Sequence, residues 1–358
     1  MKRRTFLTGL AGVVPTSALL YHLSPEDEMP LRYVDNPKLP YEKKPVDWKG
    51  TPQRSDGTFQ NLHHPFEASL YSVLKWKLET NPQAEAKKND LRRLTVEKIT
   101  LQNTSSQDSL IWLGHASYLI RLAGVTILID PVWLENWALK RFSELPFDPN
   151  QLRDVDYILL SHDHRDHCDE ATLTLLGQLV PTAKILTGLN MSTLLQPWLP
   201  KNTIQEAGWY QSYNLSQSIR ITFVPTRHWA KRGLFDTNQR LWGGFYLESQ
   251  DKSIYFMGDS GVGPHFKQIA ETLGSPDLAL MGVGAFKPEW FMHPSHTSPS
   301  DAAKAFREMG AKKFVPMHFG TFDLADERLL EPLDWLQDNP AAVNHALIVP
   351  VVGRDLLV

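Results

Sequence analysis

From about residue 94 onward, short apolar or alternating runs recur along the chain, and they predict β-strands. Residues 117–122 and 125–130 flank Ala123 and Gly124, which predicts a hairpin. Further runs, each followed by a histidine or an aspartate, predict four more strands, at residues 157–160, 218–224, 254–257 and 314–317. The chain is therefore expected to build a sheet whose strands end in polar, chemically useful side chains.

Helical spacing alternates with these strands. The apolar positions predict three helices, at residues 169–180, 264–273 and 298–309. The last of them has Ser298 as its N-cap and Pro299 at its first position, and Gly310 follows its end. Residues 94–358 are therefore expected to form one domain of mixed α and β structure.

The first 93 residues differ in pattern from this domain. Residues 1–23 contain KRRTFL followed by an uncharged stretch, which is typical of a twin-arginine export signal or an uncleaved anchor. This segment predicts delivery to the bacterial periplasm or to the inner membrane. Residues 24–93 divide into a proline-rich arm or linker, at 24–58, and an amphipathic helix, at 66–78. That helix is expected to dock on its own domain or to rest on a membrane surface.

A dense set of metal-binding residue types directly follows the strand at residues 157–160. It reads HDHRDH from His162 to His167. Neutral imidazole and carboxylate groups are good ligands for Zn²⁺ and similar ions. His162 and His164 share a face of an extended segment and are expected to bind one ion, whereas Asp166 and His167 reach a second ion after a turn. The motif therefore predicts a site for two divalent cations.

Three other predicted strands supply further ligand types at their ends. His228, Asp259 and His318 each follow a run of apolar residues. A single histidine at a strand end is more often an ordinary hydrogen-bonding residue. Together, however, these side chains are expected to meet the HDHRDH motif at one edge of a rigid sheet.

Several longer segments accompany these ligands, namely WLGHA at 112–116, IDPV at 129–132, HWAKR at 228–232, LWG at 241–243, GDSG at 258–261, GAFKPEWFM at 284–292, HTSP at 296–299 and HFGTF at 318–322. With them the chain resembles the metallo-β-lactamase fold hydrolases, from about residue 58 to about residue 335. More narrowly, it resembles the branch that contains N-acyl-phosphatidylethanolamine-hydrolysing phospholipase D. The resemblance implies an α+β fold, a four-layer αββα sandwich with an N-terminal extension.

The resemblance also implies a site with two zinc ions that share a hydroxide able to attack phosphorus or a carbonyl carbon. It implies seven zinc ligands, in two sets joined by one bridging residue: His162, His164 and His228; Asp166, His167 and His318; and Asp259 as the bridge. Asp166 and His296 are the implied catalytic residues. His296 would polarise the phosphoryl group or protonate the leaving alcohol; the alternative is that it only forms hydrogen bonds near the following helix.

The predicted function is a zinc-dependent, phospholipase D-type phosphodiesterase acting on N-acyl-phosphatidylethanolamine or a related phospholipid. Arg165, where the relatives carry tyrosine, is expected either to bind a phosphate oxygen or to form an ion pair with Asp163 or Asp169. Two alternatives stay open: a lactonase or other ester or amide hydrolase on the same site, and a non-catalytic, metal-stabilised envelope protein. His164 stands where di-iron relatives carry glutamate, which argues against a redox role.

The composition and net charge limit the kinds of partner and of cross-link that the chain can have. The chain has 358 residues, of which 42% are hydrophobic and 22% charged, enough for one large core or two modest ones. Its net charge of −3 provides no electrostatic basis for binding nucleic acid. Cys168 is the only cysteine, so no internal disulfide can form, and it is expected to pack beside the metal site rather than to bind metal.

Overall fold

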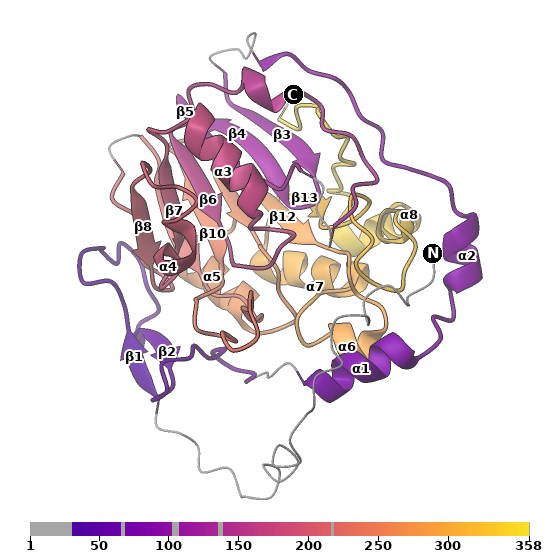
Figure 1. The fold of residues 1–358 in the computed structure, drawn as a ribbon, viewed down its shortest axis with the longest axis horizontal. Coiled ribbons are helices and arrows are strands. Elements are labelled where there is room, and N and C mark those ends of the chain that lie inside the picture. The colour runs from indigo at the N-terminus through magenta and orange to yellow at the C-terminus, as the bar shows by residue number, and fades with distance from the viewer. Residues whose placement is uncertain (1–30, 66–68, 102–106, 135–138, 216–217, 358) are drawn as a thin grey trace, which may run out of the picture.

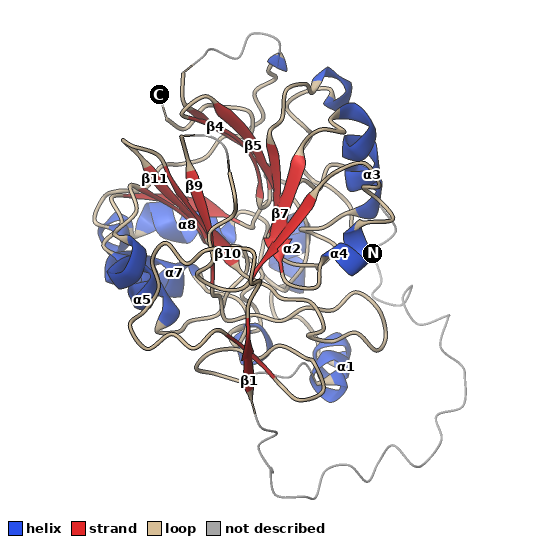
Figure 2. Ribbon diagram, turned by 90° about the vertical axis from the view of Figure 1, so that its left-hand side faces the viewer, coloured by secondary structure: helices blue, strands red, loops and turns tan. Residues whose placement is uncertain are grey.

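Two β-sheets lie face to face between two layers of helices (Figure 2). The computed structural model describes residues 31–65, 69–101, 107–134, 139–215 and 218–357. The first sheet has six strands, in the order β3 (Ser109–Gly114), β4 (Ser117–Leu122), β5 (Val125–Ile129), β6 (Tyr157–Leu160), β7 (Lys184–Gly188) and β8 (Ile204–Ala207). The second has five, in the order β13 (Lys313–Met317), β12 (Leu278–Gly282), β11 (Ser253–Phe256), β10 (Gly244–Glu248) and β9 (Arg220–Val224).

Helices cover the outer face of each sheet (Figures 1 and 2). The first sheet is covered by α3 (Glu170–Leu179) and α4 (Ser192–Leu195), and the second by α5 (His265–Leu273), α7 (Pro299–Met309) and α8 (Glu331–Asp338). The other α-helices of the described residues are α1 (Leu70–Leu78), α2 (Ala84–Asn89) and α6 (Glu289–Met292), and two short 3-10 helices span Pro149–Gln151 and Pro340–Val343. The expected four-layer αββα sandwich is therefore confirmed.

The strand directions bring several strand ends together. β5, β6, β7 and β8 run parallel to one another. In the second sheet β11, β12 and β13 run parallel, and β9 has the same direction because β10 lies antiparallel to both β9 and β11. The carboxyl ends of β9, β11 and β13 consequently lie along one edge of that sheet.

Alternation along the strands explains how one sheet serves two cores. In β6, Tyr157 and Leu159 belong to the large core between the sheets, whereas Ile158 and Leu160 pack with the apolar side of α3. Successive side chains of a strand point to opposite faces, so a strand that is buried on both faces is apolar throughout. This is why the run at 157–160 shows no polar alternation.

The helix ends and the hairpin follow their local signals. β4 and β5 pair antiparallel across Ala123 and Gly124, as predicted. Ser298 caps α7 by accepting a hydrogen bond from the backbone N–H of Asp301, and Gly310 ends the helix with a φ of 64°. Only glycine adopts that left-handed conformation without a steric cost, so α7 ends where predicted.

The proline-rich arm is not a free linker. Its strand β1 (Arg32–Val34) pairs antiparallel with β2 (Thr51–Gln53). The Asn36 side chain donates a hydrogen bond to the carbonyl of Glu206 at 2.8 Å, and Gln211 donates to the carbonyl of Leu39 at 3.0 Å. The arm is therefore held against the sandwich near the end of β8.

The amphipathic helix differs from its prediction in both position and contacts. Residues 66–68 lie outside the described part of the chain, and α1 begins at Leu70. Leu74 and Leu78, which belong to the apolar stripe of the predicted helix at 66–78, are 46% and 80% exposed. The docking contact comes instead from Trp76, which stacks on Phe291 with 5.0 Å between ring centroids. The expectation that this apolar stripe docks on the domain is therefore wrong for Leu74 and Leu78.

The export signal predicted for residues 1–23 falls outside the described residues and stays a prediction. Within the part of the chain that the structure describes, none of the helices has the length and apolar character needed to span a bilayer.

Candidate metal centre

The predicted ligands meet where the two sheets adjoin. His162 and His164 follow β6 of the first sheet, whereas His228, Asp259 and His318 follow β9, β11 and β13 of the second. The expectation of a single sheet edge was wrong in this respect. Each half of the sandwich contributes ligands, because the carboxyl end of β6 faces the shared edge of the second sheet.

The first group of ligands contains His162, His164, His228 and Asp259, and its ligand atoms lie within 4.8 Å of one another. Nε2 of His228 lies 3.1 Å from Nδ1 of His164. The Asp259 carboxylate lies 3.8 Å from Nε2 of His162 and 3.7 Å from Nε2 of His228. The structure therefore brings together the three histidines predicted for one ion.

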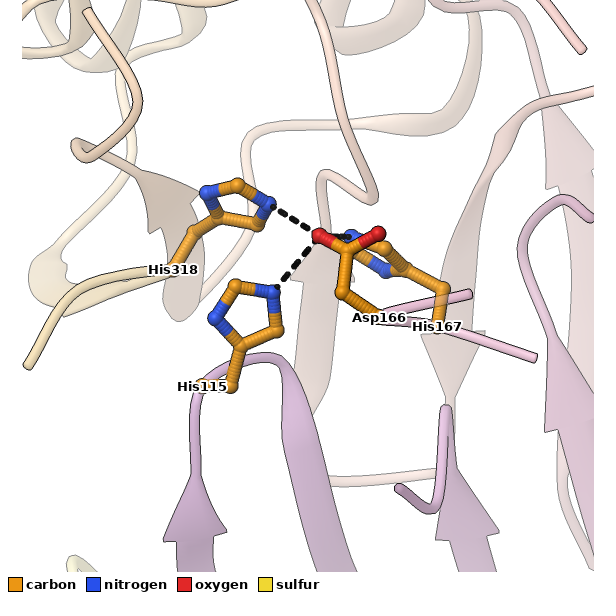
Figure 3. A group of neighbouring side chains, drawn as sticks. All are labelled: His115, Asp166, His167 and His318. Atoms are coloured by element: carbon orange, nitrogen blue, oxygen red, sulfur yellow. Dashed lines mark hydrogen bonds and ion pairs between the residues drawn. The ribbon is translucent and has the colours of Figure 1, made fainter. Parts of the chain in front are cut away.

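The second group contains His115, Asp166, His167 and His318 (Figure 3). Oδ2 of Asp166 lies 3.5 Å from Nε2 of His167 and 3.3 Å from Nε2 of His318. The N–H of His167 donates to the carbonyl of His164, which forms the turn expected between the two halves of the motif. The three residues predicted for a second ion are thus together, with His115 in addition.

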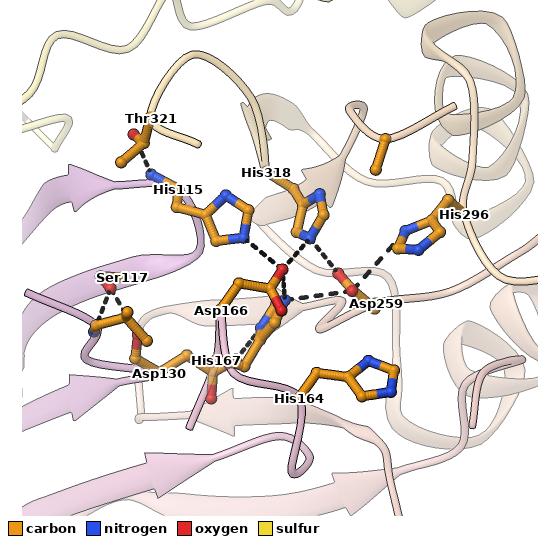
Figure 4. A network of polar contacts seen from close by, with 12 residues as sticks. His115, Ser117, Asp130, His164, Asp166, His167, Asp259, His296, His318 and Thr321 are labelled. Atoms are coloured by element: carbon orange, nitrogen blue, oxygen red, sulfur yellow. Dashed lines mark hydrogen bonds and ion pairs between the residues drawn. The ribbon is translucent and has the colours of Figure 1, made fainter. Parts of the chain in front are cut away.

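Asp259 lies between the two groups (Figure 4). Its Oδ2 is 3.2 Å from Nε2 of His167, and its Oδ1 is 3.1 Å from Nε2 of His318. The same Oδ2 is 3.7 Å from Nε2 of His228 in the first group. One carboxylate therefore faces ligands of both groups, as expected for a residue that bridges two ions.

The histidine nitrogens support a cation at this position. Within the described residues, the buried Nε2 atoms of His162, His164, His167 and His318 have no partner with hydrogen-bond geometry, although carboxylate oxygens lie 3.1–3.8 Å from three of them. A buried polar atom without a partner is costly. Several such atoms that face one carboxylate form a donor set of the kind Zn²⁺ binds. The residues present therefore fit two metal ions, each with imidazole and carboxylate ligands.

Burial lowers the pKa of these imidazoles, whereas the neighbouring carboxylates raise it. Burial lowers the pKa of His162 and of His228 well below the usual range. Burial also acts to lower the pKa of His318, but Asp259 and Asp166 raise it to about 9. A metal ion bound by His318 would displace the proton that these carboxylates favour.

Asp130 orients one histidine of each group. This fully buried carboxylate accepts from Nδ1 of His167 at 2.8 Å and from the Ser161 hydroxyl at 2.5 Å. The Ser161 hydroxyl in turn lies 2.9 Å from Nδ1 of His162. A hydrogen bond at Nδ1 leaves Nε2 available for metal and fixes the ring orientation. No role was predicted for Asp130, although it ends an apolar strand just as Asp259 does.

His115 is a further member of the site without a predicted role. Its Nε2 lies 3.1 Å from Oδ2 of Asp166. Its backbone N–H donates to the Thr321 hydroxyl at 2.8 Å, and its carbonyl accepts from the His318 N–H at 3.1 Å. His115 stands in the tight turn between β3 and β4, next to Gly114, which has a φ of 96°. The turn therefore holds the ring beside Asp166.

We expect His115→Phe to weaken metal binding at the second group while leaving the first group close to unchanged. Phenylalanine keeps a ring between His318 and Phe322 but cannot donate to Asp166. Loss of an outer hydrogen bond to a ligand typically lowers metal affinity about 10–100-fold. Competition titration with a chelating dye measures both sites, and His293→Phe, at a half-exposed histidine, is the control. Wild-type affinity at both sites would exclude this role.

His296 also lies at the centre. Its Nδ1 is 3.8 Å from Oδ2 of Asp259, and its ring centroid is 5.4 Å from that of His318. Burial lowers the pKa of His296 to about 4, although Asp259 acts in the opposite direction. The preceding residue, Ser295, accepts a hydrogen bond from Nδ1 of His228 at 2.9 Å. The segment before α7 therefore holds His296 close to both groups.

Arg165 and Cys168 lie beside the ligands. Arg165 is half-buried; burial and nearby Arg232 lower its pKa, while Glu170 and Asp169 act to raise it. Cys168 is fully buried in the core beneath α3, as expected of a packing residue.

Comparison with known proteins agrees with this fold and site. Residues 125–319, more than half of the chain, match the family model described as the beta-lactamase superfamily domain. The N-acyl-phosphatidylethanolamine-hydrolyzing phospholipase D 1 of Caenorhabditis elegans is 34% identical over 266 residues, which cover 68% of this chain and 74% of the worm protein. The mitochondrial enzyme of the same description from Saccharomyces cerevisiae is 30% identical over 241 residues, 63% of this chain and 50% of the yeast protein.

A solved metallo-hydrolase from Ignicoccus hospitalis has the same fold, with a TM-score of 0.53 and 22% identity; the match covers 69% of this chain and 97% of the archaeal one. The chain therefore belongs to the metallo-β-lactamase superfamily. It is a metal-dependent hydrolase of that fold, and within the superfamily it is similar to the phospholipases D that hydrolyse N-acyl-phosphatidylethanolamine.

Proposed function

We propose that this protein is a phospholipase D-type phosphodiesterase that uses two zinc ions to hydrolyse N-acyl-phosphatidylethanolamine or a related phospholipid. The position of Asp259 between two histidine groups, with His296 beside it, carries this proposal. The similarity to two phospholipases D supports the choice of a phosphodiester over other substrates. Zinc is chosen because imidazole and carboxylate ligands in small sets suit it.

The roles of the chain's own residues follow from their positions. Two ions at this centre would lower the pKa of water and neutralise charge that develops on the phosphoryl oxygens. Asp259 and Asp166 would balance the charge of both ions. Asp130, through Ser161 and directly, fixes the imidazoles of His162 and His167 in the orientation that binding needs. His296 is not needed to hold these imidazoles or the ions, and it acts on the substrate.

The substrate approaches from the side of Asp166 and His296. Their side chains are 15% and 17% exposed, whereas those of Asp259 and His318 are 2% and 1% exposed. His296 is therefore placed between the buried ligands and solvent, where it can donate a proton to the departing alcohol oxygen or bind a phosphoryl oxygen. Proton donation requires the charged imidazolium form of His296, whereas binding a phosphoryl oxygen requires only an N–H that faces the substrate.

Contact with a membrane surface is part of this proposal. On α1, Tyr71 in the first turn and Leu78 at the end are 74% and 80% exposed, and Lys75 and Lys77 lie in the last turn of the helix. The Lys75 ammonium lies 4.3 Å above the ring of Trp290, which is itself 44% exposed. Exposed aromatic and aliphatic groups beside lysines suit the interface of a bilayer with anionic lipid.

Hydrolysis of defined lipids tests the function. We expect vesicles that contain N-acyl-phosphatidylethanolamine to yield phosphatidic acid and N-acylethanolamine, detected by mass spectrometry. We also expect faster turnover of bis(4-nitrophenyl) phosphate than of a γ-lactone. Asp259→Asn protein, purified in parallel, controls for contaminating activity. Lactone cleavage with no cleavage of either phosphodiester would overturn the proposal and assign the site to ester chemistry.

A further inference from the structure

A loop that begins two residues after His228 presents two adjacent large apolar side chains to solvent. Leu234 is 76% exposed and Phe235 is 90% exposed. We call residues 230–238 the tip loop. Single exposed apolar residues are common on soluble proteins. An adjacent pair at the end of a loop is different, because it concentrates apolar surface at one point where a partner can cover it.

Hydrogen bonds hold the tip loop in this shape. The Asp236 carboxylate accepts from the backbone N–H groups of Arg232 and Gly233, at 3.2 and 2.7 Å. Asn238 and Ala230 are joined twice: the Asn238 N–H donates to the Ala230 carbonyl at 2.8 Å, and the Ala230 N–H donates to Oδ1 of Asn238 at 3.1 Å. The backbone at the base of the loop is thus fixed, and the apolar pair is displayed at its end.

The tip loop is also joined to the metal-binding motif. Asp163, which lies between His162 and His164 in the sequence, is fully buried. Its carboxylate accepts hydrogen bonds from the Lys231 backbone N–H at 2.8 Å and from Nε of Arg240 at 2.7 Å. Arg240 pairs in addition with Asp236. The tip loop is therefore hydrogen-bonded to the segment that carries the first ligands.

We propose that the tip loop inserts Leu234 and Phe235 into a lipid bilayer and so holds the metal centre against the membrane. This inference rests on the proposed hydrolysis of a phospholipid, because such a substrate lies in a bilayer. Lys231 gives the base of the loop positive charge, and its one carboxylate, Asp236, is paired with Arg240, whereas the Arg232 guanidinium donates inward to the carbonyls of Asp163 and Cys168. This charge suits the phosphate groups that surround an inserted side chain.

A second copy of the chain is a less suitable partner for the tip loop than a lipid bilayer. An aromatic side chain covers about 150–250 Å², so the pair falls well short of the roughly 800 Å² per partner that a stable protein interface buries. Insertion into a bilayer needs no matching surface, and two side chains are enough to contribute to it.

A dye at the tip tests insertion directly. Phe235→Cys provides one reactive thiol, because the native Cys168 is fully buried and burial raises the pKa of its thiol to about 12. After labelling with a polarity-sensitive fluorophore, we expect a blue shift on adding vesicles of phosphatidylethanolamine and phosphatidylglycerol. Val46→Cys, at a residue that is 98% exposed on the arm, is the labelled control and should not shift.

Binding is measured in parallel by sedimentation with the same vesicles. Leu234→Ser with Phe235→Ser should lower the partition coefficient by about tenfold for each side chain removed. Val46→Ser with Leu91→Ser, which removes two other exposed apolar residues, should leave it unchanged. Cleavage of soluble bis(4-nitrophenyl) phosphate should be equal in both double variants and the wild type.

Three results would overturn the inference: vesicle binding without a shift of the dye at position 235, a shift that depends on protein concentration without vesicles, and no vesicle binding at all. A different result would show that the proposed function is wrong while the insertion is correct. If the dye shifts on vesicles but no phosphodiester lipid is consumed, insertion stands and the substrate assignment falls.

Discussion

Asp259→Asn will lose bound metal and activity together. The carboxylate lies 3.1–3.8 Å from imidazole nitrogens of both ligand groups, and asparagine keeps its shape while removing the charge that balances two dications. We expect metal content to fall from about two ions per chain to below one, and the rate of phosphodiester cleavage to fall by at least about a thousandfold, since metal ions supply several kcal/mol of transition-state stabilisation.

Elemental analysis after reconstitution with excess zinc and removal of free metal measures the first quantity, and initial rates measure the second. Asp251→Asn, at an exposed aspartate, is the control and should resemble the wild type in both. An Asp259→Asn protein that retains two ions per chain would contradict the bridging role.

His296→Ala will keep its metal and slow turnover. The ring lies 3.8 Å from Asp259 and could share an ion with Asp259 and His318, but its greater exposure than theirs favours a role on the substrate. General acid–base assistance is typically worth about 10²–10⁴-fold, which is the loss we expect. His293→Ala, three residues earlier and half-exposed, is the control and should keep full activity.

Two substrates separate the roles open to His296. If it donates a proton, a phosphodiester with a poor alkoxide leaving group should lose far more rate than one that releases 4-nitrophenolate, which needs little protonation. Equal loss on both substrates would assign His296 to binding the phosphoryl oxygen. Full activity of His296→Ala on both would remove the residue from the mechanism.

Local signals in the sequence were sufficient for much of the fold. The hairpin of β4 and β5 depends on two turn residues between alternating runs, and α7 depends on Ser298, Pro299 and Gly310 at its ends. Such features are decided within a few residues, so they can be predicted without knowledge of the tertiary structure. The ligand motif at 162–167 is equally local.

The sequence could not reveal features that depend on distant contacts. His115 follows β3, and only folding places it 3.1 Å from Asp166. The apolar residues of α1 have helical spacing, yet the docking contact is made by Trp76 because Phe291 of α6 happens to face it. The division of the ligands between two sheets also depends on how the halves pack, which no spacing within either half encodes.

The division of the ligands between the sheets also affects when the centre can form. The ligands at 162–167 are synthesised before the midpoint of the chain, whereas Asp259 follows β11 and His318 follows β13, the last strand of the second sheet. A metal site of this kind is assembled by folding and is absent from the unfolded chain. Metal capture during biosynthesis therefore waits for nearly the whole polypeptide, and a chain truncated before β13 would carry the first motif without a complete centre.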